Sequence, residues 1–155
     1  MTYYTLMTQR RLSAKKREEL YEVIMEKAVC AKTAVVSPKV IDEINILQAT
    51  YEAMRQAISM LEPQPTLLLN DAVNIPGEPM KQVSIIKGDA KSISIGAASI
   101  IAKVTRDAMM VEYDKIYPEY DFASNKGYGS AKHIEALKKY GPCPIHRKSF
   151  IHNFI

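Results

Sequence analysis

Two short apolar segments of the chain each lead into an aspartate. Residues 66–69 are predicted to form a buried strand that delivers Asn70 and Asp71 at its end, and residues 81–86 a second strand followed closely by Asp89. Segments with helical spacing surround both strands, and helices that alternate with strands favour an α/β domain. Ligands of such domains bind at the carboxyl ends of the strands, which is where both aspartates are expected.

The segment before these strands is expected to contain two helices and a further strand. Ser13 can cap an amphipathic helix, and residues 29–36, VCAKTAVV, then have the composition of a short strand. Ser37 followed by Pro38 marks the start of a second helix, which ends at Pro63 and Pro65. Asn45 and Thr50 are the expected places for a break in it.

The segment after the strands is expected to be helical. Residues 91–117 are predicted to form a long helix that is small or apolar all round in its middle and therefore buried. Pro118 ends it. Ser130 can cap a last helix, which runs to Tyr140 and stops at Gly141.

The size and composition suit one folded domain. The chain has 155 residues, of which 47% are hydrophobic and 25% charged, and these values argue against intrinsic disorder. Its 21 Lys and Arg exceed its 17 Asp and Glu, a mild basic excess that is compatible with a polyanionic partner.

Neither a membrane span nor an export signal is expected. The longest uncharged apolar run, residues 92–102, is too short for a bilayer, which needs about 20 apolar residues. The N-terminal residues lack the charged-then-apolar order of a secretory signal. Cys30 and Cys143 stand far apart, so neither a disulfide scaffold nor a cysteine-rich zinc site is predicted, and a cytoplasmic location fits.

The two aspartates admit two interpretations on spacing alone. Carboxylates on rigid strand ends can converge in a cleft and bind a hard divalent cation such as Mg²⁺ or Mn²⁺. Alternatively, Asp71 starts an Asx-turn, and Asp89, directly after Gly88, lies in another turn. The spacing leaves both interpretations open.

Longer motifs of the chain resemble one protein family. They are KGDAKS at 87–92, AASIIAKVTRD at 97–107, LSAKKREELYE at 12–22, INILQAT at 44–50, KGYGS at 126–130 and HRKSF at 146–150. Together these segments closely resemble bacterial ribonuclease HII over nearly the whole chain from Leu12. Asp71 and Asp89, which stand 18 positions apart, match the third and fourth acidic residues of that family.

The resemblance implies a ribonuclease H-like mixed sheet flanked by helices. It also implies a divalent-metal-dependent endoribonuclease that cleaves the RNA strand of RNA/DNA hybrids, or duplex DNA at an embedded ribonucleotide. Asp71 and Asp89 are then the catalytic residues and the ligands of Mn²⁺ or Mg²⁺. Tyr128 is expected to stack on the sugar and help to sense the 2′-hydroxyl, with Gly127 allowing close approach of the backbone.

Basic residues in these motifs are candidate phosphate contacts, because such side chains neutralise a nucleic-acid backbone. The candidates are Lys87, Lys91, Lys103, Arg106, Lys126, Arg147 and Lys148. Asp107 is expected to pair with Lys103, one helical turn away, and is left out of the catalytic set. His133, His146 and His152 are expected on helix surfaces or as caps.

One part of the family pattern is absent from these 155 residues: the first strand, with Asp-Glu-x-Gly-Arg-Gly, which carries two of the four acids. Residues 1–155 are therefore expected to form a single, partial domain without its central strand, and residues 1–8 an unrelated or disordered lead-in. Three alternatives follow. The chain is an enzyme, alone or with a complementing N-terminal fragment; it is an inactive remnant that at most binds nucleic acid; or it is a fragment that does not fold alone.

Overall fold

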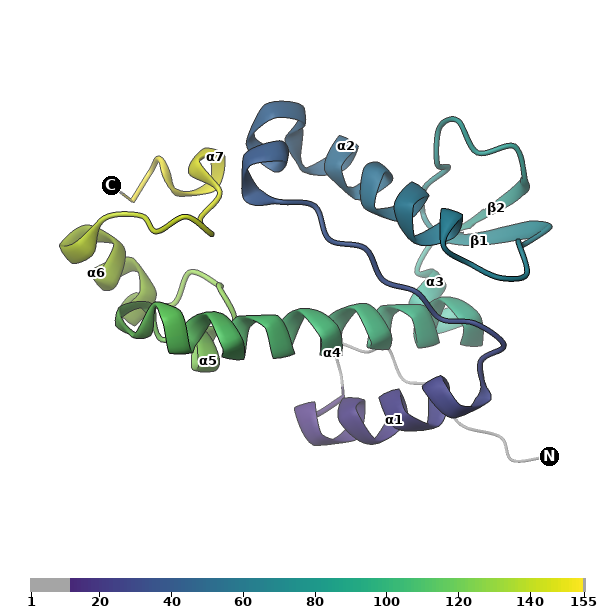
Figure 1. Ribbon diagram of the computed structural model, residues 1–155, viewed down its shortest axis with the longest axis horizontal. Helices are drawn as coiled ribbons and strands as arrows, with labels where there is room; N and C mark the ends of the chain where they lie inside the picture. The colour runs from purple at the N-terminus through teal and green to yellow at the C-terminus, as the bar shows by residue number, and fades with distance from the viewer. Residues whose placement is uncertain (1–11, 155) are drawn as a thin grey trace. The chain divides into compact units, whose positions relative to one another are not determined.

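The computed structural model describes residues 12–154 of the chain (Figure 1). Its elements are α1 (Ala14–Lys27), α2 (Pro38–Ser59), β1 (Leu67–Asp71), β2 (Lys81–Ile85), α3 (Gly88–Lys91), α4 (Ile93–Ile116), the 3-10 helix η2 (Pro118–Tyr120), α5 (Phe122–Asn125), α6 (Ala131–Tyr140) and α7 (Lys148–Ile151). They divide into two compact units. Residues 12–34 and 53–104 belong to the first unit, and residues 35–52 and 105–154 to the second. The expected lead-in, residues 1–8, lies outside the described residues.

The sheet of the first unit is a pair of parallel strands, which Figure 1 shows in teal. Asp71, at the end of β1, lies opposite Ile85, at the end of β2. The prediction that strand β1 is buried holds for one face only: Leu68 and Asn70 are buried, whereas the residues between and beside them are exposed. The α/β class predicted from the alternation of elements is confirmed, and the parallel pairing brings the carboxyl ends of both strands to one edge.

The strand predicted at residues 29–36 is wrong. This segment is irregular between α1 and α2, and Val29 is 88% exposed. A strand is held by backbone hydrogen bonds to a neighbouring strand. Within the described residues no strand pairs with this segment, so its β-branched composition does not suffice.

The caps of α1 and α2 are those that the sequence predicts. The hydroxyl of Ser13 accepts the N–H of Lys16 at 3.2 Å, and that of Ser37 accepts the N–H of Val40 at 3.3 Å. Each hydroxyl therefore satisfies one of the free N–H groups at the start of a helix.

The break expected in α2 occurs at Asn45 rather than at Thr50. Asn45 has φ +67°, in the left-handed region, and its Oδ1 accepts the N–H groups of Leu47 and Gln48 at 3.0 and 3.1 Å. The asparagine thus ends one helical segment and caps the next. Thr50 stays helical, and its hydroxyl donates to the carbonyl of Ile46 at 2.7 Å.

The helix predicted at residues 91–117 is divided at Ser92. The chain is extended there, with α3 before it and α4 after it. The hydroxyl of Ser92 accepts the N–H of Ile95 at 3.4 Å, which gives α4 its own cap. The apolar segment at the start of α4, predicted to be buried all round, is buried on one side only: Ile95, Gly96 and Ile100 are buried, whereas Ala98 and Ala102 are exposed. None of the helices in the described part of the chain is long and apolar enough to cross a membrane.

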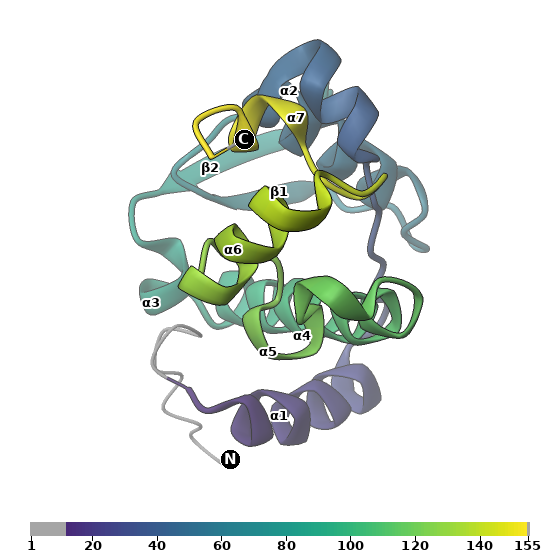
Figure 2. The ribbon, with the colours of Figure 1, turned by 90° about the vertical axis from the view of Figure 1, so that its left-hand side faces the viewer.

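The second unit packs α6 against η2 around an aromatic core. Buried members of this core are Tyr120, Phe122, Ala136, Leu137 and Ile151. Helix α6, seen with α5 and α7 in Figure 2, begins after its Ser130 cap and ends at Gly141, as predicted. The short helix α7, which supplies Ile151 to the core, has no counterpart among the predicted elements.

Candidate functional site

The two predicted catalytic aspartates lie at the carboxyl edge of the parallel strands, in the first unit. Asp71 is the last residue of β1, and its Oδ1 accepts the backbone N–H of Gly88 at 2.8 Å. Gly88 starts α3, so Asp89 follows in the first turn of that helix. The structure therefore joins the two aspartate-bearing segments directly. Within residues 12–154, no cluster of three or more His, Cys, Asp or Glu side chains has metal-site geometry.

The contact between these segments depends on the missing side chain of Gly88. A Cβ atom there would lie 2.6 Å from Cδ1 of Ile95 and 3.3 Å from Cα of Asp71. Both separations are shorter than ordinary carbon–carbon contacts. Glycine therefore lets the backbone of α3 lie against the end of β1 without crowding.

A partly buried polar network, which the sequence did not predict, holds the end of β1. The side-chain amide of Asn70 donates to Oε1 of Gln82 at 2.9 Å, and the N–H of Ile75 donates to the same oxygen at 2.8 Å. The Gln82 amide donates in return to the carbonyl of Ile75 at 2.9 Å. These bonds fasten the loop after Asp71 to β2. The only sequence signal was a glutamine inside an otherwise strand-like segment.

Three of the predicted phosphate contacts belong to the same unit. Lys87 and Lys91 are exposed and bracket Asp89 in the chain, and Lys103 is half-buried further along α4. Lys87 adopts a left-handed conformation, with φ +57°, where the chain turns into α3. The sequence therefore places cationic side chains on both sides of Asp89.

The loop that carries Tyr128 lies in the second unit and is braced by Asn125. Its Oδ1 accepts the N–H of Gly127 at 2.7 Å, and its side-chain amide donates to the carbonyl of Tyr120 at 2.7 Å. Arg106, on α4, donates to the carbonyl of Lys126 at 2.8 Å. The Lys126 ammonium donates to the carbonyl of Ala123. These bonds fix the backbone of the loop and leave the Tyr128 side chain 63% exposed.

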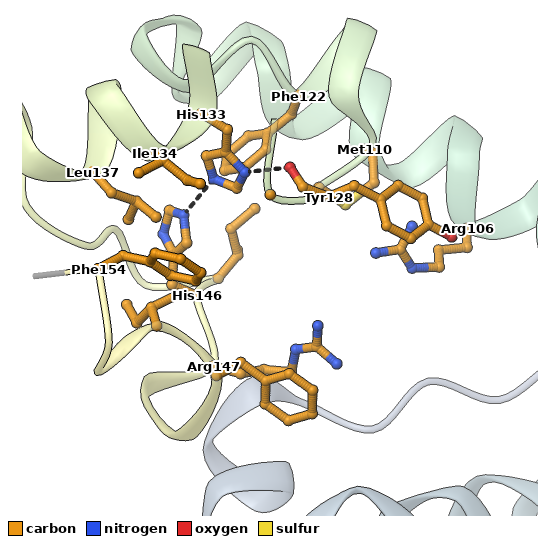
Figure 3. Close-up of a pocket in the computed structure, with 15 residues that line it drawn as sticks. Arg106, Met110, Phe122, Tyr128, His133, Ile134, Leu137, His146, Arg147 and Phe154 are labelled. Atoms are coloured by element: carbon orange, nitrogen blue, oxygen red, sulfur yellow. Dashed lines mark hydrogen bonds between the residues drawn. The ribbon is translucent and has the colours of Figure 1, made fainter. Parts of the chain in front are cut away.

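A pocket of about 230 Å³ opens beside this loop. Arg106 and Tyr128 lie on one side of the opening and Arg147 on the other (Figure 3). The guanidinium of Arg106 stands 5.5 Å from the centre of the Tyr128 ring, and that of Arg147 stands 3.8 Å from the ring of Phe150. Burial and the positive charge of Arg106 lower the pKa of Arg147, while Asp42 opposes them. An anion in this pocket would relieve the repulsion between the positive charges of Arg106 and Arg147.

Asp42 anchors the segment that carries Arg147, a role that the sequence analysis missed. Its carboxylate accepts the N–H groups of Lys148 and Ser149 at 2.8 and 3.0 Å, at the start of α7. The hydrogen bonds from Ser149 hold the pKa of Asp42 below its usual value. No local signal could reveal this contact, because more than a hundred residues separate the partners.

The expectation that His133 and His146 lie on helix surfaces or act as caps is wrong. Both rings are buried, with exposed fractions of 4% and 9%, and their Nε2 atoms are 3.0 Å apart (Figure 3). They pack edge-on and tilted against the aromatic core, which the sequence pattern of single helices cannot reveal. His152 does bond locally, through Nδ1 to the carbonyl of Ser149 at 2.9 Å.

Comparisons with known proteins point to one family. The family model for ribonuclease HII matches residues 3–153. A ribonuclease HII of Lachnoclostridium phytofermentans is 67% identical over 144 residues, which cover 93% of this chain and 57% of that protein. One of Ruminiclostridium cellulolyticum is 51% identical over 155 residues, covering 100% of this chain and 61% of that protein. The chain thus spans less than two thirds of the length of these relatives.

Solved structures resemble the fold as well. The ribonuclease H2 of Pyrococcus horikoshii superposes with a TM-score of 0.71 at 26% identity, covering 90% of this chain and 74% of that one. Ribonuclease HII in its complex with PCNA from Archaeoglobus fulgidus gives a TM-score of 0.73 at 26% identity, covering 94% and 78%. Sequence and fold agree, and the chain belongs to the ribonuclease HII family.

Proposed function

We propose that this chain carries part or all of a divalent-metal-dependent endoribonuclease. Its substrates are RNA/DNA hybrids, cleaved in the RNA strand, and duplex DNA with an embedded ribonucleotide. One observation carries the proposal. In a chain of this family, the Asp71 carboxylate accepts a 2.8 Å hydrogen bond from the backbone N–H of Gly88, the residue directly before Asp89. The proposal keeps the cytoplasmic location expected from the sequence.

The donor set around Asp71 suits Mg²⁺ or Mn²⁺. Mg²⁺ is commonly held by one or two carboxylates together with substrate phosphates, so two aspartates are compatible with it. Oδ1 of Asp71 accepts the hydrogen bond from the Gly88 N–H, and we therefore assign Oδ2 to the cation. Asp89 supplies the second carboxylate. When bound, the cation supplies Lewis-acid stabilisation to the phosphoryl oxygens and activates water.

The residues of the chain then bind and orient the nucleic acid. We assign phosphate contacts to the lysines that bracket Asp89, Lys87 and Lys91, and to Lys103, because cationic side chains neutralise the backbone that they track. In the second unit, Tyr128 offers an exposed ring to a sugar or base, next to the guanidinium of Arg106. Lys126 and Gly127 shape that loop, and Arg147 adds a second cation at the pocket.

Metal binding is tested without reference to activity. Mn²⁺ added to the ¹⁵N-labelled chain is expected to broaden the amide signals of residues 71, 88 and 89, and Mg²⁺ is expected to reverse the effect. Asp71→Asn should abolish the selective broadening. Glu112→Gln is the matched control, because Glu112 forms an exposed ion pair with Lys115 on α4 at 2.7 Å. Broadening that Asp71→Asn leaves unchanged would contradict the site.

Cleavage is tested on a duplex DNA with one ribonucleotide, beside the same duplex without it. The chain is assayed alone and with a peptide that carries the Asp-Glu-x-Gly-Arg-Gly segment. We expect ribonucleotide-dependent cleavage in at least one of the two arms, lost in Asp71→Asn and retained in Glu112→Gln. The absence of cleavage in both arms from a folded chain would favour the inactive, binding-only alternative.

A further inference from the structure

The buried histidines of the second unit belong to a chain of hydrogen bonds that ends at Tyr128. The N–H of Cys143 lies 3.0 Å from Nδ1 of His146, whose Nε2 lies 3.0 Å from Nε2 of His133. Nδ1 of His133 in turn lies 2.8 Å from the carbonyl oxygen of Tyr128. Figure 3 shows the last two of these bonds as dashed lines. This series of hydrogen bonds therefore connects the loop before His146 with the loop that carries Tyr128.

The Tyr128 carbonyl at one end of this series of hydrogen bonds determines the proton positions on both rings. A carbonyl oxygen only accepts, so Nδ1 of His133 carries the proton, and Nε2 of the neutral ring is an acceptor. Nε2 of His146 must then donate to it, which leaves Nδ1 of His146 as an acceptor. The N–H of Cys143 only donates, and it meets that acceptor. The carbonyl oxygen of Cys143 lies 3.3 Å from the same nitrogen and would favour a proton there, so the tautomers are assigned from the Tyr128 end.

We propose that His133 and His146 form a relay that positions the backbone of Tyr128 for recognition of the ribonucleotide. The two histidines are positioning residues, since they reach the substrate only through Tyr128, and the recognition part of the inference rests on the proposed function. The carbonyl of Tyr128 also accepts the N–H of Ser130 at 2.8 Å, and its N–H donates to the carbonyl of Asn125 at 2.9 Å. The relay adds a second link between this loop and the buried core, beside the bond from Asn125 to the carbonyl of Tyr120.

The surroundings of the pair disfavour a positive charge on His146. Burial, and then the charge of His133, lower the pKa of His146, and burial raises the pKa of the Cys143 thiol, whose sulfur lies 3.1 Å from His146 Nδ1. Tyr120 packs its ring against both histidines and donates its hydroxyl to Gly141 at 2.7 Å. Burial, then Cys143 and then Glu119, the carboxylate of η2, raise the pKa of Tyr120, and Glu119 also acts to raise that of Cys143. A second proton on His133 would lie on Nε2 and would set two donors against each other across the 3.0 Å contact.

Three variants of His133 separate positioning from simple burial. In His133→Asn the side-chain amide lies near the position of Nδ1 and keeps the hydrogen bond to the Tyr128 carbonyl. In His133→Gln the longer side chain reaches His146 instead and loses the bond to Tyr128. Leu loses both partners. The matched control is His152→Asn, because His152 forms a local bond outside the relay. Circular dichroism and thermal melts establish that each variant is folded, and the Asn and Gln pair carries the test if Leu fails to fold.

The first readouts do not require nucleic acid. Long-range ¹H–¹⁵N NMR correlations of the full chain near pH 8 should show His133 protonated at Nδ1 and His146 at Nε2. Exchange of the Ser130 amide should be about tenfold faster in the Gln and Leu variants than in wild type and Asn, the factor that one ordinary hydrogen bond supplies. Other tautomers, or equal exchange in Asn and Leu, would overturn the relay.

The last readout tests recognition. Fluorescence anisotropy compares the affinity for a duplex with one ribonucleotide and for the all-DNA duplex. The preference is expected to persist in the Asn variant and in the His152→Asn control, and to be lost in Gln and Leu. A preference that Gln and Leu retain would overturn the positioning role. Wild type without any preference would contradict the proposed function, and tautomers and exchange would then still decide for or against the relay.

Discussion

Replacing Gly88 by alanine tests how closely the two aspartate-bearing segments pack. The added methyl group would lie 2.6 Å from Cδ1 of Ile95 and 3.3 Å from Cα of Asp71. Ile95 is 7% exposed, so its side chain cannot move into solvent and must shift within the packed interior. The substitution is therefore expected to strain the end of β1 as well as α3.

The magnitude follows from two opposing terms. An extra methyl group in a packed interior costs about 1–3 kcal/mol, and alanine in place of glycine within a helix returns up to about 1 kcal/mol. The expected net loss of unfolding free energy is about 1–2 kcal/mol. Ile95→Val removes Cδ1, the atom in closest contact, and by itself costs about 0.5–1.5 kcal/mol. In the double variant the clash is relieved, so its loss of unfolding free energy should be about 1 kcal/mol smaller than the sum of the losses of the two single variants.

Urea unfolding, followed by circular dichroism, measures all four proteins of this cycle. Gly129→Ala is the control for a glycine replacement without crowding, because the nearest atom to its methyl group would be Cδ1 of Ile134 at 3.9 Å, an ordinary contact. That variant should stay within about 0.5 kcal/mol of wild type. If Gly88→Ala were no worse than Gly129→Ala, or if the cycle were additive within about 0.3 kcal/mol, the packing argument would be refuted.

Three further predictions concern stability. Asn45→Ala should lose about 2 kcal/mol in urea unfolding, because alanine disfavours φ +67° and removes the side-chain cap, whereas Asn45→Gly should lose only a few tenths. Ser130→Ala should lose about 1 kcal/mol by thermal melting with its cap of α6, and a smaller change would mean that water replaces the hydroxyl. Since the pKa of His146 is lowered in the folded chain, the unfolded chain binds the proton more readily. The contribution of His146 to stability is full above its ordinary pKa of 6.5 and is lost as the pH falls through the lower folded value. As the pH is lowered through this range, the urea midpoint of wild type should decrease, and that of His146→Gln should decrease less. An equal dependence of the midpoint on pH in both proteins would contradict the lowered pKa of His146.

Elements with local signals could be predicted from the sequence. The caps at Ser13, Ser37 and Ser130 act within three residues of themselves, and Asn45 tolerates the left-handed region, so each was recognisable before any tertiary contact was known. A short apolar segment likewise predicts the strand that ends at Asp71. Such features depend on neighbours in the chain, which the sequence displays directly.

What the sequence could not predict depends on distant partners. Residues 29–36 have strand composition, yet a strand exists only with a partner, and the chain there is irregular. Asp42 meets Ser149 from more than a hundred residues away, and His133 is buried because His146 and the aromatic core close over it. Metal binding by Asp71 and the phosphate contacts remain predictions.

The bond between Asp71 and Gly88 also bears on how this site tolerates mutation. The donor is a main-chain N–H, which every substitution at position 88 except proline would preserve. Yet even a methyl group at position 88 would crowd Ile95 and the backbone of Asp71, so substitution there is costly for a steric reason unrelated to the hydrogen bond. A deep mutational scan would therefore find intolerance at Gly88 even under selection for folding alone. At Asp71, where asparagine also offers a side-chain oxygen to the amide, intolerance of Asn should emerge only when cleavage is selected.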